Sequence, residues 1–201
     1  MSEIVGLFGG TFSPPHCGHI HAARSFVRRF LPDALYVMPC FIPPHKIRRD
    51  DATPAQRLEM CRLAFADIPG TVVSDLEIRR GGKSYTRDTL LSLSREGRRI
   101  LLLCGTDMFL SLEEWHCPAD IFRMAEIVLV RREEDGVLAD RIGQLTDAYR
   151  RKYGAVIHVL EDTPIVISST EIRARLAQGL PMDGYLTDGV ERYIIQCGLY
   201  H

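Results

Sequence analysis

The sequence predicts an α/β fold with a doubly wound parallel sheet, and two observations support this. Short apolar runs, most of them apolar on both faces, alternate with segments of helical periodicity, as expected for buried parallel strands joined by helices. The intervening segments are long enough to form crossover helices, which would cover both faces of the sheet. The expected strands span residues 4–8, 34–39, 71–76, 100–104, 127–130 and 155–160.

Helices are expected between these strands. Apolar residues from Ile20 to Phe30 recur at helical spacing. A second helix should begin after Thr53, because Pro54 follows it and Gln56 completes a T-x-x-Q capping box. The other helical patterns cover residues 85–96, 138–152, 169–178 and 187–197.

Composition limits the class of protein. The chain has 201 residues, of which 46% are hydrophobic and 25% charged, and its formal net charge is -1. We expect one domain over 1–201, with a small C-terminal helical portion from about residue 168. Without a basic excess, no nucleic-acid partner is expected. Neither a membrane span nor a signal peptide is apparent, so we expect no membrane association and a cytoplasmic location. A homo-oligomer is compatible with the sequence.

The segment GGTFSPPHCGH follows the first expected strand and predicts a phosphate site. Gly9 and Gly10 would allow a sharp turn and close approach of a ligand. His16 and His19 would share one face of a helix start, where free N–H groups and the helix dipole favour negative charge. The segment is neither a GxGxxG fingerprint nor a Walker A loop. The alternative is a glycine turn whose histidines cap a helix or bind a metal, although Cys17 would point away from their shared face.

The segment ISSTEIR near the C-terminus is a second candidate anion site. Ser168 and Glu171 have capping-box spacing, so a helix should begin here. Ser169 and Thr170 would lie in its first turn and Arg173 one turn later. Hydroxyls, free amides and a guanidinium would then be available to one anion. The alternative is an ordinary capped helix with a solvent-facing arginine.

Together, the two segments resemble the signature of the HxGH nucleotidyltransferase superfamily, which implies a Rossmann-like fold. The resemblance implies that both histidines contact the phosphates of ATP and that the second segment binds the triphosphate from the other side. Ser13 stands where close relatives commonly have Asp, and it keeps a short polar side chain for a loop hydrogen bond but no charge. The implied ATP-binding residues are Gly9, Gly10, Thr11, Phe12, His16, His19, Ser168, Ser169, Thr170 and Arg173, and His16, His19 and Arg173 are the implied catalytic residues.

Further segments along the whole chain are similar to those of bacterial nicotinate-nucleotide adenylyltransferases. They are PPHK, GGKSYTRDTL, GTDMF, EEW and the closing VERYIIQCGLY. The resemblance implies a second set of residues that bind nicotinate mononucleotide. These are Lys46, Ser84, Tyr85, Thr86, Gly105, Asp107, Trp115 and Arg132.

Each of these residues also has a simpler interpretation. Lys46 could meet a phosphate or carboxylate, or be a solvated surface lysine. The amides of 84–86 could receive the nicotinate carboxylate, or simply begin a helix. Asp107 could hold a ribose hydroxyl or organise Mg²⁺, or it could be the N-cap of a helix over 108–114. Trp115 could stack on the pyridine ring or pack in the core.

The reaction that the resemblance implies joins ATP and nicotinate mononucleotide to give deamido-NAD and pyrophosphate. The 5′-phosphate of the mononucleotide would attack the α-phosphorus in line, without a covalent intermediate. Mg²⁺ is expected with ATP, held mainly by its phosphates, with Asp107 as the candidate protein ligand. Two alternatives stay open. The acceptor could be nicotinamide mononucleotide or phosphopantetheine, or the chain could be a non-catalytic nucleotide-binding protein of the same fold.

Overall fold

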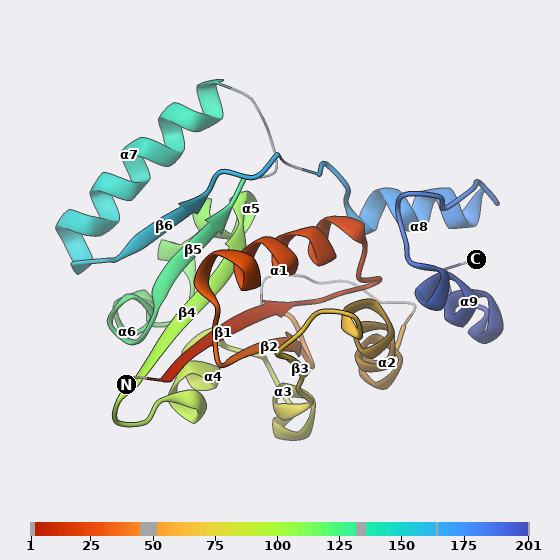
Figure 1. The fold of residues 1–201 in the computed structure, drawn as a ribbon, viewed down its shortest axis with the longest axis horizontal. Helices are drawn as coiled ribbons and strands as arrows, with labels where there is room; N and C mark the ends of the chain where they lie inside the picture. Colours follow the sequence, from red (N-terminus) through yellow and green to blue (C-terminus); the bar gives the residue numbers. More distant parts are fainter. Residues whose placement is uncertain (1–2, 45–51, 132–135, 164, 201) are drawn as a thin grey trace.

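A computed structural model describes residues 3–44, 52–131, 136–163 and 165–200. It contains a parallel six-stranded sheet in the order β3-β2-β1-β4-β5-β6, with helices on both faces (Figure 1). The predicted doubly wound sheet is therefore confirmed. Its strand order reverses between β1 and β4, and in such sheets ligands bind beyond the carboxyl ends of the strands at this point. The strands are β1 (Glu3–Gly10), β2 (Ala34–Pro39), β3 (Thr71–Val73), β4 (Arg98–Gly105), β5 (Glu126–Val130) and β6 (Ile157–Leu160).

The helices follow most of the predicted segments, with boundaries that differ by a few residues. They are α1 (Cys17–Phe30), α2 (Pro54–Phe65), α3 (Leu76–Arg80), α4 (Thr86–Leu93), α5 (Thr106–Leu110), the 3₁₀ helix η1 (Leu112–Glu114), α6 (Pro118–Met124), α7 (Gly136–Tyr153), α8 (Ser169–Ala177) and α9 (Asp188–Cys197). Both residues of the expected capping box of α2 make their bonds, with the Gln56 amide donating to the Thr53 hydroxyl at 3.2 Å. Within the described ranges, no helix combines the length and the apolar character needed to cross a membrane.

The sheet separates two hydrophobic clusters because successive strand side chains point to opposite faces. In β4, Leu101 and Leu103 belong to one cluster, whereas Ile100, Leu102 and Cys104 belong to the other. Helices α1, α2, α8 and α9 contribute to the first cluster, and α4, α5, α6 and α7 to the second. Figure 1 shows α1 lying along one face of the sheet, with α8 and α9 at the same side as α2.

Two short helices differ from the prediction. The strand expected over 71–76 ends at Val73, where its ladder with β2 stops. The Leu76 amide then donates to the Ser74 hydroxyl at 3.3 Å, and the chain turns into α3. Helix α6 was not expected at all, although Pro118 in its first turn is a favourable start. Short helices of this kind have too few turns for a clear apolar period.

Close packing at β1 depends on Gly6. A Cβ atom at this position would lie 2.5 Å from the Phe26 ring of α1 and 2.7 Å from the Leu35 side chain of β2. Only a glycine therefore lets α1 approach the sheet this closely. This approach places the first turn of α1 next to the carboxyl end of β1.

Candidate active site

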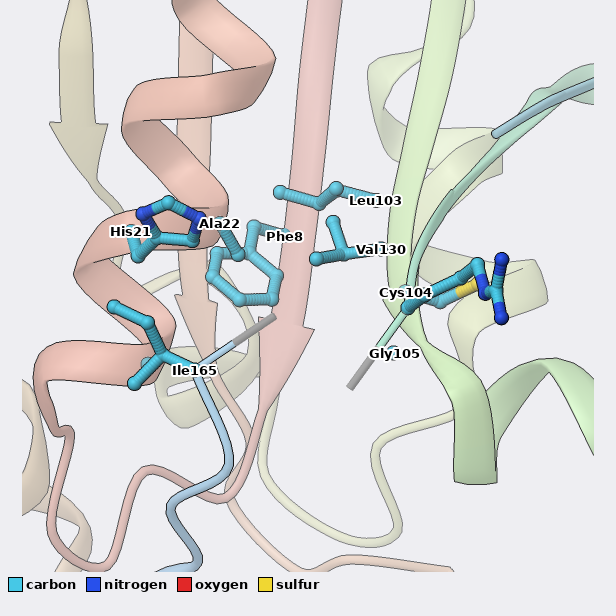
Figure 2. Close-up of a pocket in the computed structure, with 10 residues that line it drawn as sticks. Phe8, His21, Ala22, Leu103, Cys104, Gly105, Val130 and Ile165 are labelled. Atoms are coloured by element: carbon cyan, nitrogen blue, oxygen red, sulfur yellow. The ribbon is translucent and has the colours of Figure 1, made fainter. Parts of the chain in front are cut away.

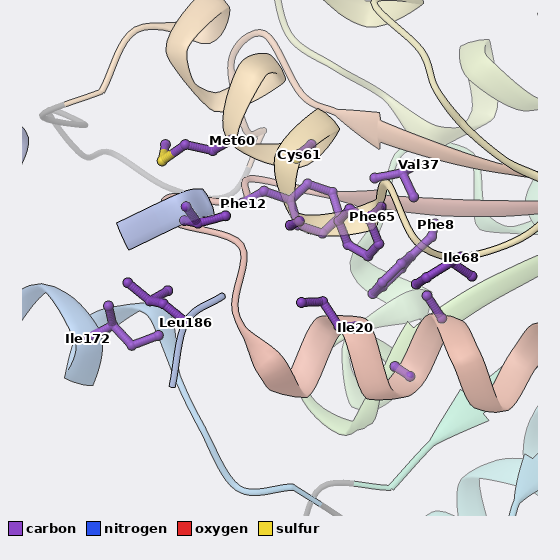
Figure 3. Close-up of a cluster of buried hydrophobic side chains, with 14 of the residues drawn as sticks. Phe8, Phe12, Ile20, Val37, Met60, Cys61, Phe65, Ile68, Ile172 and Leu186 are labelled. Atoms are coloured by element: carbon purple, nitrogen blue, oxygen red, sulfur yellow. The ribbon is translucent and has the colours of Figure 1, made fainter. Parts of the chain in front are cut away.

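The loop after β1 is anchored in the core by Phe12. This residue has a φ of 50° and a side chain that is only 2% exposed. Its ring lies 5.4 Å from the Phe8 ring and 5.9 Å from the Phe65 ring of α2, measured between centroids (Figure 3). A positive φ is costly for a residue with a side chain, and it persists where packing enforces it. The burial of Phe12 thus holds the loop backbone at the edge of the sheet.

His16 and His19 lie together at the start of α1, as their spacing predicts. His16 is the N-cap and is 2% exposed, and the two ring centroids are 3.7 Å apart. The His16 amide donates to Nδ1 of His19 at 3.2 Å. An accepting Nδ1 carries no proton, so the proton of a neutral His19 ring is on Nε2. His19 therefore offers an N–H donor on the side of the ring away from the helix start.

The glycine between the histidines lies in a tight space. A Cβ on Gly18 would lie 3.1 Å from Nδ1 of His16 and 3.3 Å from the carbonyl oxygen of Ile165. Gly9 has the opposite surroundings, because a Cβ there would meet no atom within 4 Å in the described part of the chain. Gly18 leaves room for the His16 ring, and Gly9 leaves open space at the carboxyl end of β1.

The two predicted anion-binding segments are in direct contact. Arg173 of α8 donates from Nη1 to the carbonyl oxygen of Ser13 at 2.6 Å, and Nη2 donates to the Thr170 hydroxyl at 3.2 Å. The Ser169 hydroxyl donates to the carbonyl oxygen of Pro14 at 2.9 Å. Ser168 is the N-cap of α8, as predicted, and accepts the Glu171 amide at 3.1 Å. The start of α8 therefore holds the loop that precedes α1.

Ser13 makes a contact that the sequence did not suggest. We expected its hydroxyl to accept a bond from its own loop. Instead it lies 3.0 Å from the phenol oxygen of Tyr200, and both residues are buried. The C-terminal segment therefore reaches the loop after β1.

Ser84 and its neighbours lie between α3 and α4. The Ser84 hydroxyl, which is buried, accepts the Phe41 amide at 2.9 Å, and the Ser84 amide donates to the carbonyl oxygen of Ile42 at 2.9 Å. The Tyr85 amide donates to the carbonyl oxygen of Lys83 at 3.2 Å. These two amides are thus engaged within the chain, which contradicts their expected availability to a carboxylate. Thr86 is the first residue of α4.

Aromatic rings gather beside this segment. The Tyr85 ring lies 4.5 Å from the ring of His116, with an angle of 36° between the planes. Trp115 is half-buried, packs against the second cluster, and donates from Nε1 to the Ser111 hydroxyl at 3.3 Å. Its position combines the two alternatives for this residue, because one part packs in the core while another part stays accessible.

Asp107 is exposed in the first turn of α5. Gly105, not Asp107, is the N-cap of this helix, which covers 106–110 instead of the expected 108–114. The N-cap interpretation of Asp107 is therefore wrong, and its carboxylate is available to a ligand from the carboxyl end of β4. Lys46 and Arg132 lie outside the described residues.

A pocket opens between α1 and the carboxyl ends of β4 and β5 (Figure 2). Its walls are mainly apolar and include Phe8, Leu103, Val130 and Ile165, whereas His21 and Arg131 supply polar groups. Gly18 of α1 and Gly105 at the end of β4 also line it. Its volume is only about 10 Å³, which is about the size of one water molecule.

Across the described ranges, no group of three or more His, Cys, Asp or Glu side chains is arranged to hold a metal ion. A single carboxylate is nevertheless a common protein contribution to Mg²⁺, whose other ligands are then water and substrate phosphates. The exposed Asp107 fits this role. The donor set is thus compatible with Mg²⁺ that arrives with a polyphosphate.

Sequence reasoning missed three residues at the site: Arg57, Glu77 and Tyr200. Arg57 is 1% exposed, and its spacing from Met60, Cys61 and Ala64 places it on the apolar face of α2. A charged residue at a core position of an amphipathic helix was the available signal. Glu77 and Tyr200 offered no comparable signal.

The family comparison covers most of the chain. Residues 7–175 match the model of the cytidylyltransferase-like family. The protein of Thermoanaerobacter sp. (strain X514), named "Probable nicotinate-nucleotide adenylyltransferase", is 34% identical over 98% of this chain and 93% of its own. A protein of the same name from Roseiflexus sp. (strain RS-1) is 35% identical over 99% of this chain and 98% of its own.

Solved structures agree on the fold. The Plasmodium falciparum nicotinic acid mononucleotide adenylyltransferase complexed with NaAD has a TM-score of 0.78, with 15% identity over 98% of this chain and 97% of that one. The same enzyme complexed with APC has a TM-score of 0.74, with the same identity and coverage. At 15% identity the solved structures support only the fold, whereas the sequence relatives establish the family. On these matches over nearly its full length, this chain belongs to the nicotinate-nucleotide adenylyltransferases, a family of nucleotidyltransferases.

Proposed function

We propose that this chain transfers the adenylyl group of ATP to nicotinate mononucleotide, with release of pyrophosphate, and that the contact between its two anion-binding segments builds the phosphate site. The observation that carries this proposal is the bond of 2.6 Å from Arg173 to the Ser13 carbonyl oxygen. It brings a guanidinium and a second helix start to the loop that presents His16 and His19. We place this reaction in the cytoplasm, where ATP is available.

The proposed reaction needs no covalent bond between the protein and a substrate. A phosphate dianion is already a nucleophile, so its attack on the α-phosphorus of ATP needs no base from the protein. The obstacle is repulsion between anions and the need to align them. Positioned donors and positive charge lower this barrier without forming a covalent intermediate.

The ATP side of the site follows from this requirement. Nε2 of His19 is the donor that we assign to the developing charge of the pyrophosphate, with His16 and Arg173 beside it. The backbone of Gly9 to Phe12 approaches the phosphates, and Ser168, Ser169 and Thr170 contribute the start of α8.

The mononucleotide side is assigned to the segment around α4 and α5. The half-buried Trp115 and the Tyr85–His116 pair supply aromatic surfaces for a pyridine ring. The start of α4 at Thr86 favours a negative carboxylate through the helix dipole. Gly105 and Asp107 lie at the end of β4 and suit a ribose hydroxyl. Lys46 and Arg132 stay in this assignment on the strength of the sequence resemblance alone.

Mg²⁺ bound to the phosphates of ATP would offset their charge, with Asp107 as the candidate protein ligand. The residues of this chain act beside it. His16, His19 and Arg173 orient the triphosphate, and the two helix starts contribute amide donors.

A paired turnover assay tests the proposal. Pyrophosphate release is measured with ATP and an equal concentration of nicotinate mononucleotide, nicotinamide mononucleotide or phosphopantetheine. We expect release to depend on the acceptor and to be about tenfold or more faster with the nicotinate form, because a site that binds a carboxylate rejects an acceptor lacking it.

Two results would contradict it. Faster turnover with one of the other acceptors would assign the chain to that acceptor. Binding of ATP without any acceptor-dependent release of pyrophosphate would indicate a non-catalytic nucleotide-binding protein. Since Trp115 is the only tryptophan in the sequence, its fluorescence can report binding in both cases.

A further inference from the structure

A buried arginine lies between the two halves of the proposed site. Arg57 of α2 is 1% exposed, and it is the largest of the almost fully buried side chains. Within the part of the chain that the structure describes, its guanidinium donates to two main-chain carbonyl oxygens and to the Cys40 sulfur, and it bonds no carboxylate. A buried charge without an opposite charge is unfavourable, and arginine does not lose its proton in proteins. Its retention in the core therefore calls for a specific reason.

The two carbonyl oxygens come from two different loops. Nη1 donates to Thr11 in the loop after β1 at 2.8 Å, and Nη2 donates to Phe41 after β2 at 3.1 Å. The guanidinium is a planar, rigid fork, so it sets the distance between the two acceptors. A lysine, with one nitrogen on a flexible chain, has no such geometry.

The second loop is bonded in turn to the mononucleotide side. The Phe41 amide donates to the hydroxyl of Ser84, and the Ser84 amide donates to the carbonyl oxygen of Ile42. One continuous series of bonds therefore runs from Thr11 through Arg57 and Phe41 to Ser84.

We infer that Arg57 is a positioning residue, which holds the ATP loop at Thr11 and the mononucleotide segment at Ser84 at the separation needed for in-line attack. This inference rests on the proposed function. If Arg57 has this role, loss of its guanidinium should impair the alignment of two bound substrates more than it impairs the binding of either one. Misplacement by about 1 Å costs on the order of 100-fold in rate when reacting groups must be aligned.

The test compares Arg57→Lys and Arg57→Met with Arg62→Lys and Arg62→Met. Arg62 lies on the same helix, is exposed, and pairs with Glu59 at 3.1 Å, so it controls for charge removal from α2. The dissociation constants of ATP and of nicotinate mononucleotide are measured separately by Trp115 fluorescence. The value of kcat is then normalised to the fraction of protein that binds ligand.

For both Arg57 variants we expect kcat per binding site to fall about tenfold or more, with each dissociation constant within about threefold of the original. The Arg62 variants should retain both parameters. If Arg57→Met does not fold, Arg57→Lys carries the comparison alone, because it keeps the positive charge but lacks the planar fork.

A kcat per binding site that stays near the original in the Arg57 variants would overturn the inference. So would a loss of activity that the dissociation constants explain entirely, since that is the signature of a damaged binding site. Failure of the proposed function is distinct from both results, because the unsubstituted chain would then lack turnover with nicotinate mononucleotide.

Discussion

The hydroxyl of Ser13 lies 3.0 Å from the phenol oxygen of Tyr200, which joins the loop after β1 to the end of the chain across 187 positions of sequence. Arg173 and Ser169 hold the carbonyl oxygens of the same short segment. The loop that carries the proposed phosphate-binding residues is therefore fixed by groups from the C-terminal portion. This arrangement makes the last residues part of the site.

The first prediction concerns that hydroxyl pair. Ser13→Ala and Tyr200→Phe each remove one partner and leave the other buried without it. We expect each to lower the free energy of unfolding by about 1–3 kcal/mol, and the double variant to cost less than the sum of the two. Urea unfolding of the four proteins gives this cycle. Strictly additive losses would show that the two hydroxyls do not interact.

The second prediction concerns His19. Its Nδ1 accepts the His16 amide, which places the proton of a neutral ring on Nε2, the atom to which we assign the bond to the phosphates. We expect His19→Ala to lower kcat by about 100-fold or more, as loss of one positioned donor does. The control is His158→Gln, since His158 lies on β6 and bonds Glu126 at 2.7 Å. Turnover of His19→Ala equal to that of the control would remove His19 from the catalytic residues.

The third prediction uses two helical glycines. In Gly18→Ala the new methyl group would lie 3.1 Å from Nδ1 of His16, so this ring must shift. We expect kcat to fall about tenfold or more while the free energy of unfolding changes by less than about 1 kcal/mol.

Gly143→Ala in α7 is the matched control, because its methyl group would meet no described atom within 4 Å. It should raise the free energy of unfolding by about 0.5–1 kcal/mol without an effect on kcat. Equal activity of the two variants would show that the His16 position does not matter.

Much of this architecture follows from local sequence. The buried strands are legible because parallel strands covered on both faces need apolar residues at nearly every position. The two predicted anion-binding segments can also be recognised from the sequence, because glycines, histidines and capping residues act over a few positions. Because each motif is short and local, the sequence predicts two separate sites and does not predict the contact between them.

Contacts between distant segments could not be predicted in this way. The bond from Arg173 to Ser13 spans 160 positions, and that from Arg57 to Thr11 spans 46. Both join segments that are distant in the sequence, and no local pattern encodes which main-chain oxygen each arginine meets. The amides of Ser84 and Tyr85 were misjudged for a related reason, because the loop after β2 and the preceding turn supply their acceptors.

The last prediction concerns the pH dependence of stability. Burial raises the pKa of the Glu77 carboxyl group, although bonds from Thr89 and Ser84 and the charge of Arg80, 3.9 Å away, lower it in part. The folded chain therefore holds this proton more tightly than the unfolded chain, whose ordinary pKa is 4.5. The stabilising contribution is complete below that value and is lost as the pH rises through the higher folded-state pKa.

Glu77→Gln cannot ionise, so it should gain stability relative to the original chain as the pH rises from about 4.5 towards neutrality. Urea unfolding at a series of pH values measures this difference. Glu113→Gln is the matched control, because the hydrogen bond from Lys152 lowers the pKa of the exposed Glu113. The difference in free energy of unfolding between Glu113→Gln and the original chain should change in the opposite direction. The original chain should be the more stable one at pH values above the ordinary pKa of the carboxyl group. A Glu77→Gln difference that is independent of pH would show that this buried carboxyl group titrates as it does in the unfolded chain.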